Sequence, residues 1–178
     1  MSLNQAFIAE LTQEAAATRR MLERVPVSRN DWKPHDRSMS LGRLAMHVVE
    51  QTGWITMAMA TDELDFLQFG YKPIMDATVE ELLEKHDESV EQAIAILDLA
   101  KDADFDKMWT LRRGDRIIFT LHKKAVLRSF SLNHMIHHRG QLSVYLRLLD
   151  VPLPGMYGPT ADDVAAAAIL EQEMAAVN

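Results

Sequence analysis

Apolar residues recur at steps of three and four along several stretches of this 178-residue chain, the period of a helix that buries one face. The first such stretch covers residues 4–25. A second begins after Ser40, whose hydroxyl can accept the first free amide hydrogens of a helix, and a third covers residues 78–100, with acidic residues in its first turn. A short C-terminal helix rich in alanine is expected behind Asp162-Asp163.

The remaining segments complete the predicted fold. A fourth helix is expected over residues 121–149, and the proline-rich segment 151–155 ends it. Residues 61–78 lose the helical period and are expected to form a long connection, whereas residues 104–120 have the features of a short hairpin. We therefore predict an all-α four-helix bundle with one long connection and the short C-terminal helix, in a single domain that spans residues 1–178.

Composition narrows the classes of function. The formal net charge is −7, and Lys and Arg are scattered along the chain, so a nucleic-acid-binding role is disfavoured. No apolar run approaches the roughly 20 residues that cross a bilayer, so we expect no membrane association and a cytoplasmic location. The chain contains no cysteine, which excludes disulfides and thiol catalysis by its own side chains.

Three histidines are candidate metal ligands. His134 and His138 are spaced i, i+4 within the fourth predicted helix, where such residues lie about 40° apart around the axis and about 6 Å along it. His47 lies in the apolar second helix. Three imidazoles that converge between packed helices would bind a divalent ion and leave one or more positions open to water or substrate.

Other interpretations of these histidines stay open. Imidazoles on a half-buried helix face can simply bond to backbone groups or water, in which case no metal binds and the protein is a structural interaction module. His137 competes with His138 for the inward face, but it is rotated about 100° from His138, so we place it at the flank. The remaining histidines are interpreted as structural or solvated: His35, His86 and His122.

Two well-known metal signatures do not fit the chain. A zincin needs glutamate directly after its first histidine, and that position is Met135 here. Di-iron bundles use Glu-x-x-His, a pattern that does not occur in this sequence. A mononuclear ion with nitrogen ligands remains, and nickel, zinc or iron would each accept such a site.

The sequence resembles the DinB/YfiT-like superfamily of small helical bundles over most of its length. The resemblance rests on the segment 40–47 (SLGRLAMH), on His134-x-x-x-His138 followed by Arg-Gly-Gln-Leu, and on the segment 149–159 (LDVPLPGMYGP). It implies an up-up-down-down bundle, usually paired into a homodimer. It also implies that His47, His134 and His138 are the three metal ligands.

The resemblance leaves the reaction open. Members of this superfamily are described as metal-dependent hydrolases, and some relatives look like thiol S-transferases or isomerases that use bacillithiol, mycothiol or glutathione. We therefore expect either an enzyme that acts on a small molecule, with a divalent metal and a low-molecular-weight thiol or water, or a non-catalytic binding or stress-response module. Candidates to orient a ligand or support the metal ligands are polar residues on the same two helices: Gln51, His137, Gln141 and Tyr145.

Overall fold

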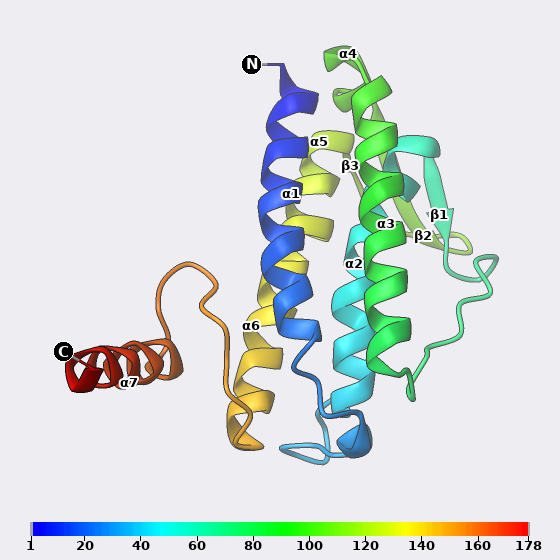
Figure 1. The fold of residues 1–178 in the computed structure, drawn as a ribbon. Helices are drawn as coiled ribbons and strands as arrows, with labels where there is room; N and C mark the ends of the chain where they lie inside the picture. Colours follow the sequence, from blue (N-terminus) through cyan, green and yellow to red (C-terminus); the bar gives the residue numbers. More distant parts are fainter. Residues whose placement is uncertain (1, 178) are drawn as a thin grey trace.

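The computed structural model describes residues 2–177 and is mostly helical. Four long helical segments lie side by side (Figure 1). They are α1 (Leu3–Leu22), α2 (Leu41–Ala60), α3 (Val79–Leu99) and a continuous segment made of α5 (Lys123–Val126), a π-helical turn (Leu127–Leu132) and α6 (Asn133–Leu148). Two short helical pieces, Val27–Arg29 and α4 (Asp102–Phe105), lie in the connections.

The helix directions differ from the expected up-up-down-down order. The start of α1 lies beside the end of α3, where the Asn4 side-chain amide donates to the Asp98 carbonyl at 3.5 Å, and the end of α1 lies beside the first half of α3, where Arg19 pairs with Asp87 at 3.2 Å. Helices α1 and α6 run in one direction, and α2 and α3 run in the other (Figure 1). The long connection between α2 and α3 makes this order possible because it returns the chain to the end of the bundle where α2 began.

Local capping chemistry explains the helix starts. The Ser40 hydroxyl accepts the Arg43 amide at 3.3 Å, as predicted. Thr78 and Glu81 form a reciprocal capping box, in which the Thr78 hydroxyl accepts the Glu81 amide and the Glu81 carboxylate accepts the Thr78 amide. These local signals place the first turns of α2 and α3 within a residue of their predicted positions.

A small three-stranded sheet corrects the all-α assignment. The predicted hairpin is confirmed, since β2 (Met108–Arg113) pairs antiparallel with β3 (Arg116–His122). The sequence pattern missed β1 (Glu63–Asp65), which lies in the long connection and pairs parallel with β2. Because β3 continues to His122, the fourth helix begins at Lys123, two residues later than predicted.

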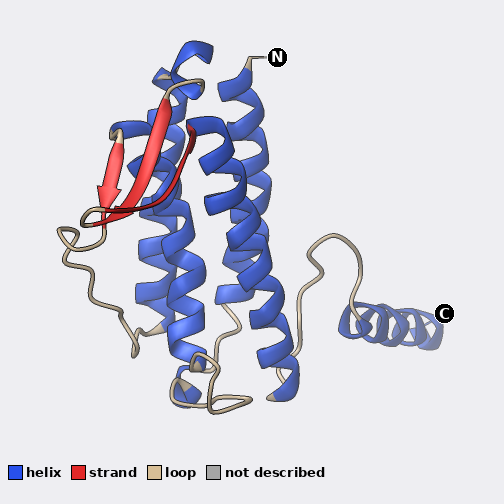
Figure 2. Ribbon diagram, turned by 180° about the vertical axis from the view of Figure 1, so that it is seen from behind, coloured by secondary structure: helices blue, strands red, loops and turns tan. Residues whose placement is uncertain are grey.

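The sheet packs against the helices through one tryptophan. Trp109 of β2 is fully buried, its ring lies 6.3 Å from that of Trp54 on α2, and its indole N–H donates to the Thr61 hydroxyl at 3.0 Å. The sheet thereby covers the end of α2 (Figure 2).

The C-terminal helix α7 (Ala161–Val177) is longer than predicted and projects away from the other helices (Figure 1). Its first turn is capped by Thr160, whose hydroxyl accepts the Asp163 amide at 3.2 Å. No helix within residues 2–177 is long and apolar enough to span a membrane.

Candidate metal centre

The structure brings the three predicted histidines together between α2 and α6. One ring nitrogen from each of His47, His134 and His138 lies within 4.8 Å of the others. The ring centroids are 5.3 Å apart for His47 and His134, 4.4 Å for His47 and His138, and 4.6 Å for His134 and His138. The three rings, from two helices, therefore converge as the sequence predicted.

Contacts between the two helices fix the positions of these rings. Ser131 donates from its hydroxyl to the Gln51 carbonyl at 2.6 Å, and the Thr52 hydroxyl contacts the Met135 sulfur at 3.8 Å. Directly before α6, the chain makes a π-helical turn over Leu127–Leu132. Such a turn adds a residue to the helical repeat and rotates everything that follows, so it sets which face of α6 meets α2.

Each of the three rings has a partner outside the cluster. His138 contacts the Gln141 side-chain oxygen through Nδ1 at 2.7 Å, and His47 contacts Glu50 Oε2 through Nδ1 at 3.3 Å. His134 is hydrogen-bonded to the Phe130 backbone. Metal-binding histidines usually donate one ring N–H to such a partner, which fixes the tautomer and leaves the other nitrogen for the ion.

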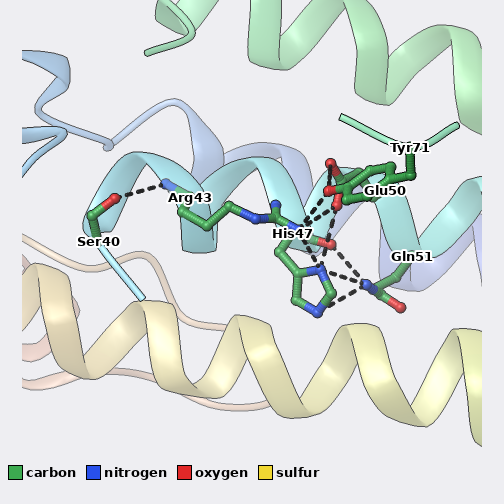
Figure 3. A network of polar contacts seen from close by, with 6 residues as sticks. All are labelled: Ser40, Arg43, His47, Glu50, Gln51 and Tyr71. Atoms are coloured by element: carbon green, nitrogen blue, oxygen red, sulfur yellow. Dashed lines mark hydrogen bonds and ion pairs between the residues drawn. The ribbon is translucent and has the colours of Figure 1, made fainter. Parts of the chain in front are cut away.

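A polar network surrounds His47 (Figure 3). Arg43 donates from Nη2 to Glu50 Oε2 at 2.9 Å and to the Tyr71 hydroxyl at 2.6 Å, and Tyr71 donates to Glu50 Oε1 at 2.7 Å. Burial opposes ionisation of Glu50, but hydrogen bonds from His47 and Tyr71 and the charge of Arg43 lower its pKa overall. Burial and the neighbouring Glu50 raise the pKa of Tyr71 to about 12, so at neutral pH Glu50 is a carboxylate and Tyr71 is a neutral phenol.

Gln51 also lies against the His47 ring (Figure 3). Its amide nitrogen donates to the His47 carbonyl at 3.0 Å and lies 3.1 and 3.2 Å from the two ring nitrogens. Among the described residues its Oε1 is buried without a hydrogen-bond partner. Gln51 was predicted as a supporting residue, and the structure places it in direct contact with the cluster.

The electrostatics of the cluster suit a cation. Burial lowers the pKa of His138 to about 4, and burial together with the nearby His47 lowers the pKa of His134. Both rings are therefore neutral at pH 7 and keep a lone pair for a metal ion. A set of three imidazoles fits zinc, nickel or iron, whereas calcium and magnesium prefer oxygen ligands.

Two cavities reach the histidine cluster. A cavity of about 460 Å³, hereafter the aromatic cavity, meets His47 and His134. Its other lining residues are Arg43, Glu50, Gly53, Trp54, Met57, Phe66, Phe69, Tyr71, Ser89 and Phe130. A second cavity of about 400 Å³ meets His138 and is lined by more polar residues, among them Arg37 and Gln141.

The other predicted residues lie at the flank of the cluster. His137 points its Nε2 to the Gln141 amide nitrogen at 3.0 Å, and its ring lies 4.9 Å from that of His138. The geometry thus places His137 beside the histidine cluster, at the flank that the helical phase predicted. Tyr145 lines the second cavity, and its hydroxyl donates to the Met39 carbonyl at 3.3 Å. His86 is remote, on α3, and pairs with Asp87.

Sequence reasoning missed Arg43, Glu50 and Tyr71. A signal existed for the first two, because positions four before and three after His47 share its side of α2. No such signal existed for Tyr71, which reaches the site from the irregular connection between β1 and α3.

Comparisons with known proteins agree with this fold. A model of the DinB family matches residues 1–174. The uncharacterized protein YrdA of Bacillus subtilis (strain 168) is 28% identical over 160 residues, which cover 89% of this chain and 90% of YrdA. The crystal structure of the DinB-like protein YjoA of Bacillus subtilis has a TM-score of 0.66 at 20% identity and covers 85% of this chain and 97% of its own. A DinB-like protein of Bacillus cereus ATCC 10987 has a TM-score of 0.65 at 20% identity, with 86% and 97% covered.

Proposed function

Because the chain belongs to the DinB family, we propose that it is a metal-dependent protein in which His47, His134 and His138 hold one divalent ion, namely zinc, nickel or iron. The observation that carries this proposal is the arrangement of three ring nitrogens within 4.8 Å of one another, each ring with its own outer partner. Imidazoles that are at least half-buried and face one another without a hydrogen bond gain little from each other, whereas a shared cation satisfies all three.

The activity we propose is transfer of a small thiol to a small electrophilic molecule. A bound divalent ion would lower the pKa of a thiol or water at its open position, and so supply the nucleophile that a chain without cysteine lacks. Two side chains would orient the metal ligands: Glu50 contacts the His47 ring, and Gln141 contacts the His138 ring. The aromatic cavity would keep the electrophile out of bulk water.

Hydrolysis is the second candidate reaction. It needs a group that takes a proton from the attacking water, and Glu50 is the one carboxylate among the described residues that line the aromatic cavity. Its oxygens already accept hydrogen bonds from Arg43 and Tyr71, so it is poorly available as a base. This observation supports thiol transfer over hydrolysis as the proposal.

Elemental analysis tests the metal site directly. Purified wild-type protein should contain close to one equivalent of metal per chain, and His47→Ala and His138→Ala should lose it. His35→Ala, at an exposed position in a loop, is the matched control and should keep the wild-type metal content. Equal metal content in all four proteins would refute the proposed ligands.

An activity screen tests the reaction. Metal-loaded protein is incubated with low-molecular-weight thiols and electrophiles, and product formation is followed by mass spectrometry. Thiol adducts that form with wild type and not with His138→Ala would support the transferase. Inactivity toward all pairs would remove the transferase and leave the alternative, a binding or stress-response module on the same bundle. That module would retain a small molecule tightly without changing it.

The pairing of two chains stays a prediction. The resemblance implies a homodimer, and analytical ultracentrifugation of the wild-type protein tests it.

A further inference from the structure

The aromatic cavity runs along one face of α2 and changes character along its length. Its α2 residues follow one another at helical spacing: Arg43, His47, Glu50, Trp54 and Met57. At a rise of 1.5 Å per residue, Arg43 and Trp54 are separated by about 16 Å along the axis. The cavity therefore has a charged end at Arg43 and an apolar end at Trp54.

Aromatic rings form the apolar end. The Trp54 ring meets Phe130 edge to face at 4.7 Å and Phe66 at 6.4 Å. Met57 completes this part of the lining. Flat apolar groups pack well against such rings, in stacked or edge-to-face contact.

The charged end has positive charge in excess once an ion is bound. Arg43 and Glu50 pair with each other and cancel, and Glu50 is the one acidic residue among the described residues that line the cavity. The charge of a divalent ion on the three histidines is then uncompensated. In a partly apolar cavity, this excess favours an anionic ligand over a neutral or cationic one.

We propose that the ligand of the aromatic cavity is a small aryl carboxylate, whose rings lie against Trp54 and Phe130 and whose carboxylate lies beside His47, where the Arg43 guanidinium and the metal centre meet. A carboxylate can accept a charge-assisted hydrogen bond from a guanidinium and also suits a divalent ion. A phosphate fits less well, because its larger charge is usually met by several basic side chains or a helix N-terminus, and Arg43 is the one basic side chain among the described lining residues. The inference rests on the proposed function, since the positive excess comes from the ion.

Calorimetry with three probes of the same shape tests the inference. They are 2-naphthoate, the neutral 2-naphthylmethanol and the cationic 2-naphthylmethylamine, each titrated into zinc-loaded, dialysed full-length protein. The zinc content of every sample is measured first. Wild type should bind naphthoate at least about tenfold more tightly than the alcohol, the usual scale for a charge-assisted hydrogen bond, and the amine most weakly.

Two variants assign the preference to Arg43. Arg43→Met should weaken naphthoate binding by about tenfold or more and leave the alcohol nearly unchanged, because a charge-assisted contact is lost while the apolar lining remains. Arg37→Met, which changes an arginine of the second cavity, is the matched control and should bind naphthoate as wild type does.

The outcomes separate this inference from the proposed function. Stoichiometric zinc without a preference for naphthoate overturns the aryl carboxylate and leaves the metal centre intact. Equal naphthoate affinity in wild type and Arg43→Met overturns the role of Arg43. Absence of zinc from wild type after loading overturns the metal centre itself, and the ligand inference falls with it.

Discussion

Two polar clusters meet α6 at the neighbouring residues His138 and Arg139. They differ in whether the members of the cluster satisfy one another by hydrogen bonds and opposite charge. The histidine cluster contains His138 and faces α2, whereas Arg139 faces α1. We call the second group the arginine cluster: Arg139, Glu14, Thr18 and Tyr157. The side chains of His138 and Arg139 are both buried, at 8% and 2% exposed, whereas His47 and His134 are half-buried.

The arginine cluster is complete within the chain. Arg139 donates to Glu14 Oε2 at 2.6 Å, to the Tyr157 hydroxyl at 2.7 Å, and to the Glu14 carbonyl and the Thr18 hydroxyl at 3.0 Å each. Its charge is cancelled by Glu14, which is 5% exposed. The cluster thus joins α1, α6 and the segment before α7 without any ligand.

The rings of the histidine cluster have partners outside the cluster but none among themselves. Among the described residues no hydrogen bond joins His47, His134 and His138, although their ring nitrogens lie within 4.8 Å of one another. Burial of polar groups therefore does not by itself indicate function. A cluster whose donors and acceptors match stabilises the fold, whereas ring nitrogens that face one another without a hydrogen bond between them are candidates to bind a cation.

The largest effect on stability is expected for Arg139→Met. The change leaves the buried Glu14 carboxylate without its cationic partner and with only the Tyr157 hydroxyl donating to it among the described residues, which should lower the free energy of unfolding by about 3–5 kcal/mol in urea denaturation. Arg128→Met is the matched control, because Arg128 also pairs a residue of this helical segment with a glutamate of α1, Glu10, but both are substantially exposed. That control should cost about 1 kcal/mol or less. Equal losses in the two variants would contradict the distinction.

The next effect is expected on metal affinity in His138→Ala. Loss of one of three ligands should weaken zinc binding by more than about 100-fold in competition with a chromogenic chelator, because even outer partners of metal ligands contribute 10–100-fold. The folded content measured by circular dichroism should stay close to wild type. Unchanged affinity would show that the cluster is not the zinc site.

The stability of the metal-free protein should depend on pH through His138. Its pKa is about 4 when folded and near the ordinary value of 6.5 when unfolded, so the unfolded chain takes up the proton first as pH falls. Stability should therefore be full above pH 6.5 and decline between pH 6.5 and about 4, by on the order of 2 kcal/mol. His138→Asn should lose most of this decline. An identical pH profile in the two proteins would contradict the assignment.

The smallest effect is expected for the outer partner Gln141. Gln141→Leu removes the oxygen that contacts His138 Nδ1, and should weaken zinc binding by about tenfold in the same chelator competition. His137→Ala is the control, since His137 lies beside the cluster and should leave zinc affinity unchanged. A stronger effect of His137→Ala than of Gln141→Leu would show that His137 is a ligand.

Local signals predicted most of the fold, and long-range pairing explains what they missed. Ser40 and Thr78 fix helix starts through hydrogen bonds within three residues, so the sequence alone reveals them. Strand β1 has three residues and depends on β2, which is more than forty positions away in the chain. The direction of α3 relative to α2 follows from the path of the long connection, which carries no periodic pattern.

The candidate site was predictable only where it depends on local helical spacing, and not where it depends on contacts between distant segments. The spacing of His134 and His138 is a local property of a helix, and the apolar setting of His47 pointed to burial. Glu50 and Arg43 could have been found from their helical spacing to His47. Tyr71 and the aromatic cavity could not, because they arise where segments distant in sequence come together.

X-ray absorption spectroscopy at the zinc edge, on zinc-loaded wild-type protein, tests the central claim most directly. The account predicts three imidazole nitrogens at about 2.0–2.1 Å, with the multiple-scattering features of histidine rings, and at least one exchangeable oxygen or nitrogen ligand in the remaining coordination position. Loss of this signature in His47→Ala would link it to the cluster. A zinc shell of oxygen atoms alone, or a histidine signature unchanged in His47→Ala, would contradict the account.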